Sequence, residues 1–78
     1  MITTVQVRAI MRKHNAHHIW TNKTKGHKGI ARRVKCWATG DKVAMMSELR
    51  SVAGASNVYE GTDTAVVYNS IIVKCELA

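Results

Sequence analysis

The sequence predicts a single small α+β domain in which two helices cover one face of an antiparallel sheet. Two segments have the apolar spacing of amphipathic helices, and several others have the alternation or the residue types of strands. The expected order is helix, two strands, helix, and two or three strands. A chain of 78 residues is too short for two cores, so we expect residues 1–78 to form one domain.

The first helix is expected over residues 4–15. Thr3 followed by Gln6 matches a capping box, a pattern that marks the N-terminus of a helix. Residues suited to a buried stripe then recur three and four positions apart. They are Val7, Ile10, Met11 and His14. Arg8 and Arg12 fall on the opposite side, which we expect to face solvent.

Two strands are expected next, from His18 to Lys23 and from Ile30 to Ala38, as a hairpin with a basic tip. β-branched and aromatic residues favour the strands. Gly26 and Gly29 favour a turn between them.

Alternation along the second strand separates an inward set of side chains from an outward set. The inward set is Ile30, Arg32, Val34, Cys36 and Ala38. The outward set is Ala31, Arg33, Lys35 and Trp37. The place of Trp20 stays open, because it depends on the register of the hairpin. If Trp20 pairs with Arg33 it joins the outward face, and if it pairs with Val34 it packs into the core.

The second helix is expected to begin at a cap formed by Thr39 or Asp41 and to end at Gly54. Its apolar side has the spacing of a buried helical stripe. That side consists of Met45, Leu49 and Val52, supported by Met46 and Ala53.

The C-terminal third predicts further strands. We expect a short strand over residues 58–60, a turn over Gly61-Thr62-Asp63 and a strand from Thr64 to Tyr68. A tail strand follows, in which Ile71, Val73, Cys75 and Leu77 alternate with Ile72, Lys74 and Glu76. Asn69-Ser70 is compatible with a turn or with a kink. The apolar run at residues 64–68 fits a strand covered on both sides, which makes a homodimer possible.

The positive charge is concentrated in the first half of the chain. The net charge is +7, but residues 1–42 hold ten Lys and Arg against Asp41 alone, whereas residues 43–78 hold two against four acids. Ordinary surfaces mix both signs of charge. This half of the chain therefore predicts contact with a polyanion.

We interpret the basic helix and hairpin as a nucleic-acid-binding face. Lys and Arg displace counterions from phosphates, and an exposed indole offers a surface on which an unpaired base can stack. The candidate residues, expected to form one continuous patch on the backbone of DNA or RNA, are Arg8, Arg12, Lys13, Lys23, Lys25, Lys28, Arg33, Lys35 and Trp37. A buried Trp37 would remove the stacking half of this argument.

Two other interpretations use the same charge. The basic face could bind an acidic surface of a larger protein or nucleoprotein complex, as an accessory or inhibitor protein of the phage or mobile-element type does. It could also be a solubilising surface in which edge lysines prevent aggregation.

No catalytic, cofactor or strong metal motif is present in the sequence, so we expect a non-enzymatic protein without cofactors. His14, His17 and His18, with His27 or Cys36, do not have one of the stronger zinc spacings. Without a signal segment or an apolar run of membrane-spanning length, we expect a cytoplasmic chain. Cys36 and Cys75 are accordingly expected as reduced thiols.

Overall fold

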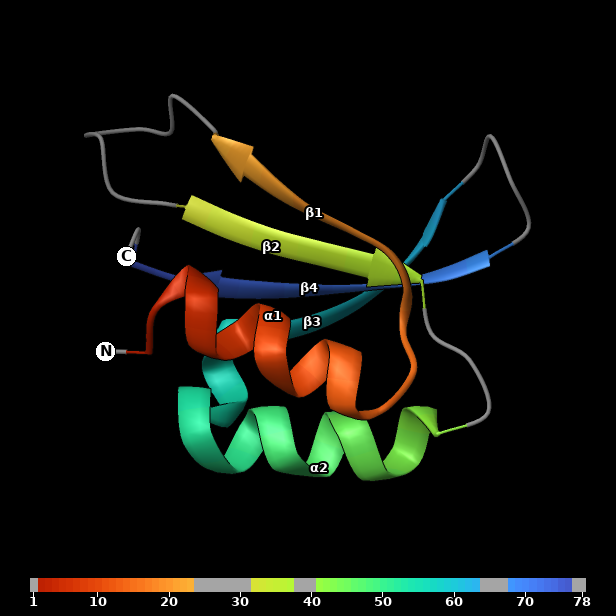
Figure 1. Cartoon of the computed structure of the whole chain (residues 1–78), viewed down its shortest axis with the longest axis horizontal. Coiled ribbons are helices and arrows are strands. Elements are labelled where there is room, and N and C mark those ends of the chain that lie inside the picture. The colour runs from red at the N-terminus through yellow and green to blue at the C-terminus, as the bar shows by residue number, and fades with distance from the viewer. Residues whose placement is uncertain (1, 24–31, 38–40, 64–67, 77–78) are drawn as a thin grey trace.

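A computed structural model describes residues 2–23, 32–37, 41–63 and 68–76 (Figure 1). It shows a small α+β domain with two helices and a four-stranded antiparallel sheet, as the sequence predicts. In chain order the elements are α1 (Thr4–Lys13), β1 (His17–Lys23), β2 (Arg32–Trp37), α2 (Lys42–Ala53), a short 3₁₀ turn η2 (Ala55–Asn57), β3 (Val58–Asp63) and β4 (Tyr68–Cys75). The predicted turn at Gly26 and Gly29 lies outside the described residues.

The strands lie in the order β1-β2-β4-β3, so β2 and β4 are central and β1 and β3 are edges. Val34 pairs with Val73, and Cys36 pairs with Ile71. Both helices pack on the same side of the sheet (Figure 1), where α1 contacts β1, β2 and β4 and α2 contacts β3 and β4. Within the described ranges, no helix is long and apolar enough to cross a membrane.

The start of α1 confirms the predicted capping box. The amide of Gln6 donates to Thr3 Oγ1 at 3.3 Å, and the amide of Thr3 donates to Gln6 Oε1 at 2.9 Å. These two bonds satisfy backbone donors that the first turn of a helix leaves free. The helix ends at Lys13, two residues earlier than expected, and Asn15 then adopts a positive φ of 59° that turns the chain into β1.

The second helix begins after Asp41 and has Gly54 at its C-cap position, both as predicted, but the Asp41 side chain makes no capping hydrogen bond. Gly54 has φ 90°, a conformation that glycine adopts at little cost. The predicted place of Val52 in the core is wrong, since half of its surface (50%) is exposed. Ala53 turns toward the core instead, in line with Met45 and Leu49 at four-residue steps.

The turn predicted over Gly61-Thr62-Asp63 is wrong, because these residues continue β3. Likewise Tyr68 begins β4 rather than ending an earlier strand, and β4 runs through Asn69-Ser70 without a turn. Gly61 pairs with Ser70, so the ladder satisfies backbone groups that a local turn would otherwise use. The rest of the strand predicted from Thr64, residues 64–67, lies outside the described residues.

The core lies between the helices and the inward side chains of β2 and β4. Val34, Cys36, Ile71 and Val73 have no exposed surface, which confirms the alternation predicted for both strands. Helical side chains close the core from the other side. These are Val7 and Met11 from α1, and Met45, Met46, Leu49 and Ala53 from α2.

Both cysteines are free and buried, as predicted. Burial raises the pKa of the Cys36 thiol to about 11, and it also raises the pKa of Cys75. Both therefore remain neutral at physiological pH and pack as small apolar side chains.

Replacing Leu49 with alanine is expected to lower the free energy of unfolding by about 2–5 kcal/mol, because the side chain is fully buried and its loss leaves a cavity. Urea unfolding followed by circular dichroism measures this change. Val52→Ala, on the same helix but half exposed, is the control and should cost less than about 1 kcal/mol. Equal losses in the two variants would contradict the packing described above.

Candidate nucleic-acid interface

The outward side chains of the four strands form the surface that we call the open face, because no described element covers it. Register places Trp20 opposite Lys35 and Tyr59 opposite Ile72, so one row crosses all four strands. The neighbouring rows hold Trp37 with Ser70 on one side and Arg33 with Lys74 on the other. The open face therefore gathers residues from both halves of the chain.

A β-bulge in β1 determines the position of Trp20. His17 pairs with Trp37, and without an irregularity the same register would place Trp20 opposite Val34 and hence toward the core. One extra residue between His17 and Trp20 shifts the pairing, so Trp20 lies opposite Lys35. Trp20 thus joins the outward face, but in neither of the two pairings that the sequence suggested.

The bulge also places His18 in an unusual conformation. Its φ is 50°, in the left-handed region that non-glycine residues rarely occupy. Such a conformation costs about 1–2 kcal/mol. The imidazole lies against the indole of Trp37, with ring centroids 4.0 Å apart and planes tilted by 53°. This ring contact offsets part of the free-energy cost of the strained φ at His18.

The two tryptophans of the chain contact each other on the open face. The centroids of Trp20 and Trp37 are 6.3 Å apart, and the rings meet edge to face at 89°. Both side chains are half-buried rather than fully covered. Trp37 is therefore not buried in the core, so the stacking argument is not removed. Part of its surface contacts the rings of His18 and Trp20.

Cations lie beside these aromatic rings. Lys35 Nζ is 5.3 Å from the ring centroid of Trp20, and Lys74 Nζ is 5.6 Å from that of Tyr59. Both distances are within the range of a cation–π contact. Tyr59 is 42% exposed, so the row of aromatic and cationic groups extends to the far edge of the sheet.

The charged side chains that the structure describes on the open face are mainly cations. The exposed Glu76 follows the end of β4. The other charged side chains described there are Arg33, Lys35 and Lys74. The middle of the face is thus positively charged.

The cations predicted on the first helix do not share this face, because α1 packs on the opposite side of the sheet (Figure 1). Arg8 is half-buried and donates to Thr21 Oγ1 of β1 at 3.4 Å. Arg12 is exposed on α1. Lys23 ends β1, and Lys25 and Lys28 lie outside the described residues. The expected patch is therefore divided between two layers.

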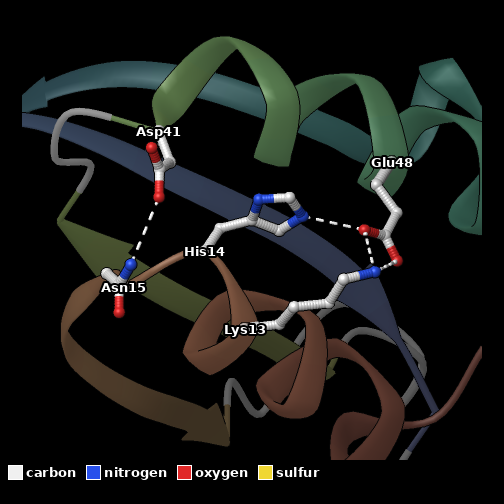
Figure 2. Close-up of polar contacts among 5 residues, drawn as sticks. All are labelled: Lys13, His14, Asn15, Asp41 and Glu48. Carbon is white, nitrogen blue, oxygen red and sulfur yellow. Dashed lines mark hydrogen bonds and ion pairs between the residues drawn. The ribbon is translucent and has the colours of Figure 1, made fainter.

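Lys13 belongs to a cluster that joins the two helices (Figure 2). Its Nζ lies 2.9 Å from Glu48 Oε1, and His14 Nε2 lies 2.8 Å from the same oxygen. The hydrogen bond with His14 and then that with Lys13 lower the pKa of Glu48. Nearby, Asn15 donates to Asp41 across the same interface at 3.2 Å. Lys13 and His14 thus help to hold α1 against α2.

The described histidines do not gather around a common point. His14 contacts Glu48, whereas His18 contacts Trp37 on the open face. Within the part of the chain that the structure describes, no group of three or more His, Cys, Asp or Glu side chains could hold a metal ion.

Sequence reasoning did not assign four residues of the open face to the candidate site: His18, Tyr59, Lys74 and Trp20, whose place it left open. The alternation of the tail strand already separates Lys74 and Ile72 from the buried residues. What it does not reveal is that β4 lies beside β2, which is the pairing that places Lys74 next to Arg33.

The chain matches no protein-family model, and comparisons with curated proteins and with solved structures gave no match. The functional argument therefore depends on the geometry of the open face.

The Glu48 cluster predicts a specific dependence of stability on pH. Because the folded state lowers the pKa of Glu48 below its ordinary value of 4.5, the stabilisation is complete above that value and is lost as the pH falls through the folded-state pKa. Thermal unfolding at several pH values should therefore show that Glu48→Gln lowers the melting temperature at pH 6 and not at strongly acidic pH.

The exposed carboxylate Glu76 provides the control for this experiment. Glu76→Gln should follow the wild-type profile across the same pH range. If Glu48→Gln and wild type differed equally at every pH, ionisation of Glu48 would not be the source of the stabilisation.

Proposed function

We propose that this protein is a small non-enzymatic nucleic-acid-binding module whose ligand lies on the open face. The observation that carries the proposal is the adjacency of Trp20, Lys35 and Trp37 on the side of the sheet away from the helices. Binding uses cations to contact phosphates and rings to contact bases.

The charge of the face supports a polyanionic ligand. Arg33 and Lys74 are paired across β2 and β4, and Lys35 occupies the next row of the same face. These cations are attached to paired strands, so the positions of their backbones are fixed before a ligand arrives. Binding then orders side chains alone, which costs less entropy than ordering a loop together with its side chains.

The aromatic residues give the proposal a second kind of contact. The cations Arg33, Lys35 and Lys74 would pair equally well with an acidic protein surface, so their charge alone favours neither partner. Trp20 and Trp37 lie beside those cations and remain partly exposed. Nucleic acid uses both kinds of group, because its phosphates are anionic and its bases are flat and apolar.

The cations of α1 have a smaller part in this proposal. Lys13 contacts Glu48 and Arg8 contacts Thr21, so both contribute to the stability of the fold. Arg12 contributes to the positive field that attracts a polyanion, a long-range effect that salt screens.

Binding is expected to depend steeply on salt. Contact with three phosphates through Arg33, Lys35 and Lys74 predicts a slope of log affinity against log salt of about −2 to −3. That slope weakens binding by roughly 15- to 65-fold between 50 and 200 mM salt. Fluorescence anisotropy of labelled DNA and RNA measures it, and a failure to bind either nucleic acid at low salt would refute the proposal.

Reversing the charge of two residues on the open face should weaken binding without unfolding the protein. Arg33→Glu combined with Lys35→Glu is expected to lower the affinity for DNA or RNA by at least about tenfold, since it removes phosphate contacts and adds repulsion. Outward charges contribute little to stability, so circular dichroism and the melting temperature should remain close to wild type.

The exposed Arg50 of α2 supplies a matched control on the helix side of the domain. Arg50→Glu changes the net charge as much as Lys35→Glu alone does. The Lys35 variant should weaken binding several times more than the Arg50 variant. Equal losses would show that net charge, and not the open face, governs binding.

A further inference from the structure

We infer that the open face binds single-stranded nucleic acid, with unpaired bases stacked on the rings of Trp20 and Trp37. This inference rests on the proposed function and deepens it, since phosphate contact alone does not distinguish a single strand from a duplex. Three features of the face argue for unpaired bases: the position of the rings, the width of the sheet and the bulge in β1.

The rings lie where bases can reach them. In a duplex the base faces are stacked on one another, so an aromatic side chain on a flat protein surface has no base face to contact. In a single strand those faces are free, and aromatic side chains stack on them with little sequence preference. Trp20 and Trp37 lie in adjacent rows of the open face, next to Lys35, so one strand can contact rings and cations together.

The sheet is too wide to enter a duplex groove. Neighbouring strands lie about 4.8 Å apart, so the distance from β1 to β3 is roughly 14 Å before side chains are counted. The major groove of DNA is about 12 Å wide and admits a helix or a two-stranded ribbon. The row from Trp20 to Tyr59 crosses all four strands. A duplex would therefore contact this face through phosphates only.

The bulge supplies independent support. It carries an extra residue, an unfavourable φ at His18 and a local change of register, and its result is that Trp20 faces outward beside Trp37. Bulges that re-aim a side chain are common next to functional sites. An indole turned from the core side to the open face gives up part of the hydrophobic gain of burial, because Trp20 is only half-buried there, and a ligand that stacks on the ring would restore that part.

We expect the bound nucleic-acid strand to run across the sheet, from the tryptophans on β1 and β2 toward Tyr59 on β3. Lys35 lies in the row of Trp20 and Tyr59, and Lys74 lies in the neighbouring row beside Tyr59. Rings and cations therefore lie side by side across the sheet, as bases and phosphates do along a nucleic-acid strand.

The intrinsic fluorescence of the protein tests the inference directly, because both of its tryptophans lie on the open face. Wild-type protein is titrated at low salt with a single-stranded thymidine oligonucleotide of about 12 nucleotides, a duplex of equal length and a heparin oligosaccharide. We expect the single strand to bind more tightly than the duplex and to quench the emission. Heparin, which has no bases, should bind without comparable quenching.

Substitution of the rings gives a second readout. Trp20→Leu should lower the affinity for the single strand by about 5- to 150-fold, the range expected for one lost stacking contact. Its affinity for heparin should stay within about twofold of wild type, because the cations are unchanged. Circular dichroism shows whether the variant is folded, and the heparin measurement then shows that its cations still bind a polyanion.

The outcomes separate the two claims. Duplex binding that equals or exceeds single-strand binding, without quenching, would overturn the inference and leave the proposed function standing. An unchanged affinity of Trp20→Leu for the single strand would also overturn it. Absence of binding to both nucleic acids at low salt would instead refute the proposed function itself.

Discussion

The pairing of β2 with β4 is the constraint on which the rest of the molecule depends. Val34, Cys36, Ile71 and Val73 have no exposed surface, and all four point toward the helices. In a strand the side-chain period is two, so this inward set fixes the outward set as well. A slip by one residue would bring Arg33 and Lys35 into the core and expose the apolar residues. The register that builds the core on one face of the sheet therefore also places the residues of the candidate site on the other face.

In the part of the chain that the structure describes, both helices cover the same side of the sheet. A domain of 78 residues buries a modest fraction of its surface, and its two helices suffice for one face. They are held there by apolar packing and by the cluster of Lys13, His14 and Glu48 between them. Side chains on the other face must then be compatible with water. Cations with long apolar stems and aromatic rings meet this condition, and they are also the groups that bind polyanions.

Much of the fold could be predicted because the decisive signals are local. The capping box at Thr3, the glycine at the end of α2 and the alternation along β2 and β4 each involve neighbours a few residues apart. The patterns that failed depend on partners far along the chain. Gly61 and Ser70 resemble turn residues in isolation, yet they pair with each other in the sheet.

The candidate site was predictable only in part, for the same reason. The outward position of Arg33, Lys35 and Trp37 follows from alternation alone. Lys13 was assigned to the patch because its charge is visible in the sequence, whereas its partner Glu48 lies 35 residues away. A charge count treats every cation alike, but a cation that bridges two helices is less available to a ligand than one on an open sheet.

The bulge in β1 connects the fold to the candidate site most directly. Uninterrupted pairing from His17 with Trp37 would place Trp20 inward, where a large indole gains most from burial. The chain instead adopts an unfavourable φ at His18 and keeps Trp20 at the surface, while Thr21 takes the place opposite Val34. Contacts among the three rings offset part of this cost. Local strain that turns a large apolar side chain away from the core is hard to explain by stability alone, and a ligand that stacks on the half-buried indole would cover the ring surface that the fold leaves exposed.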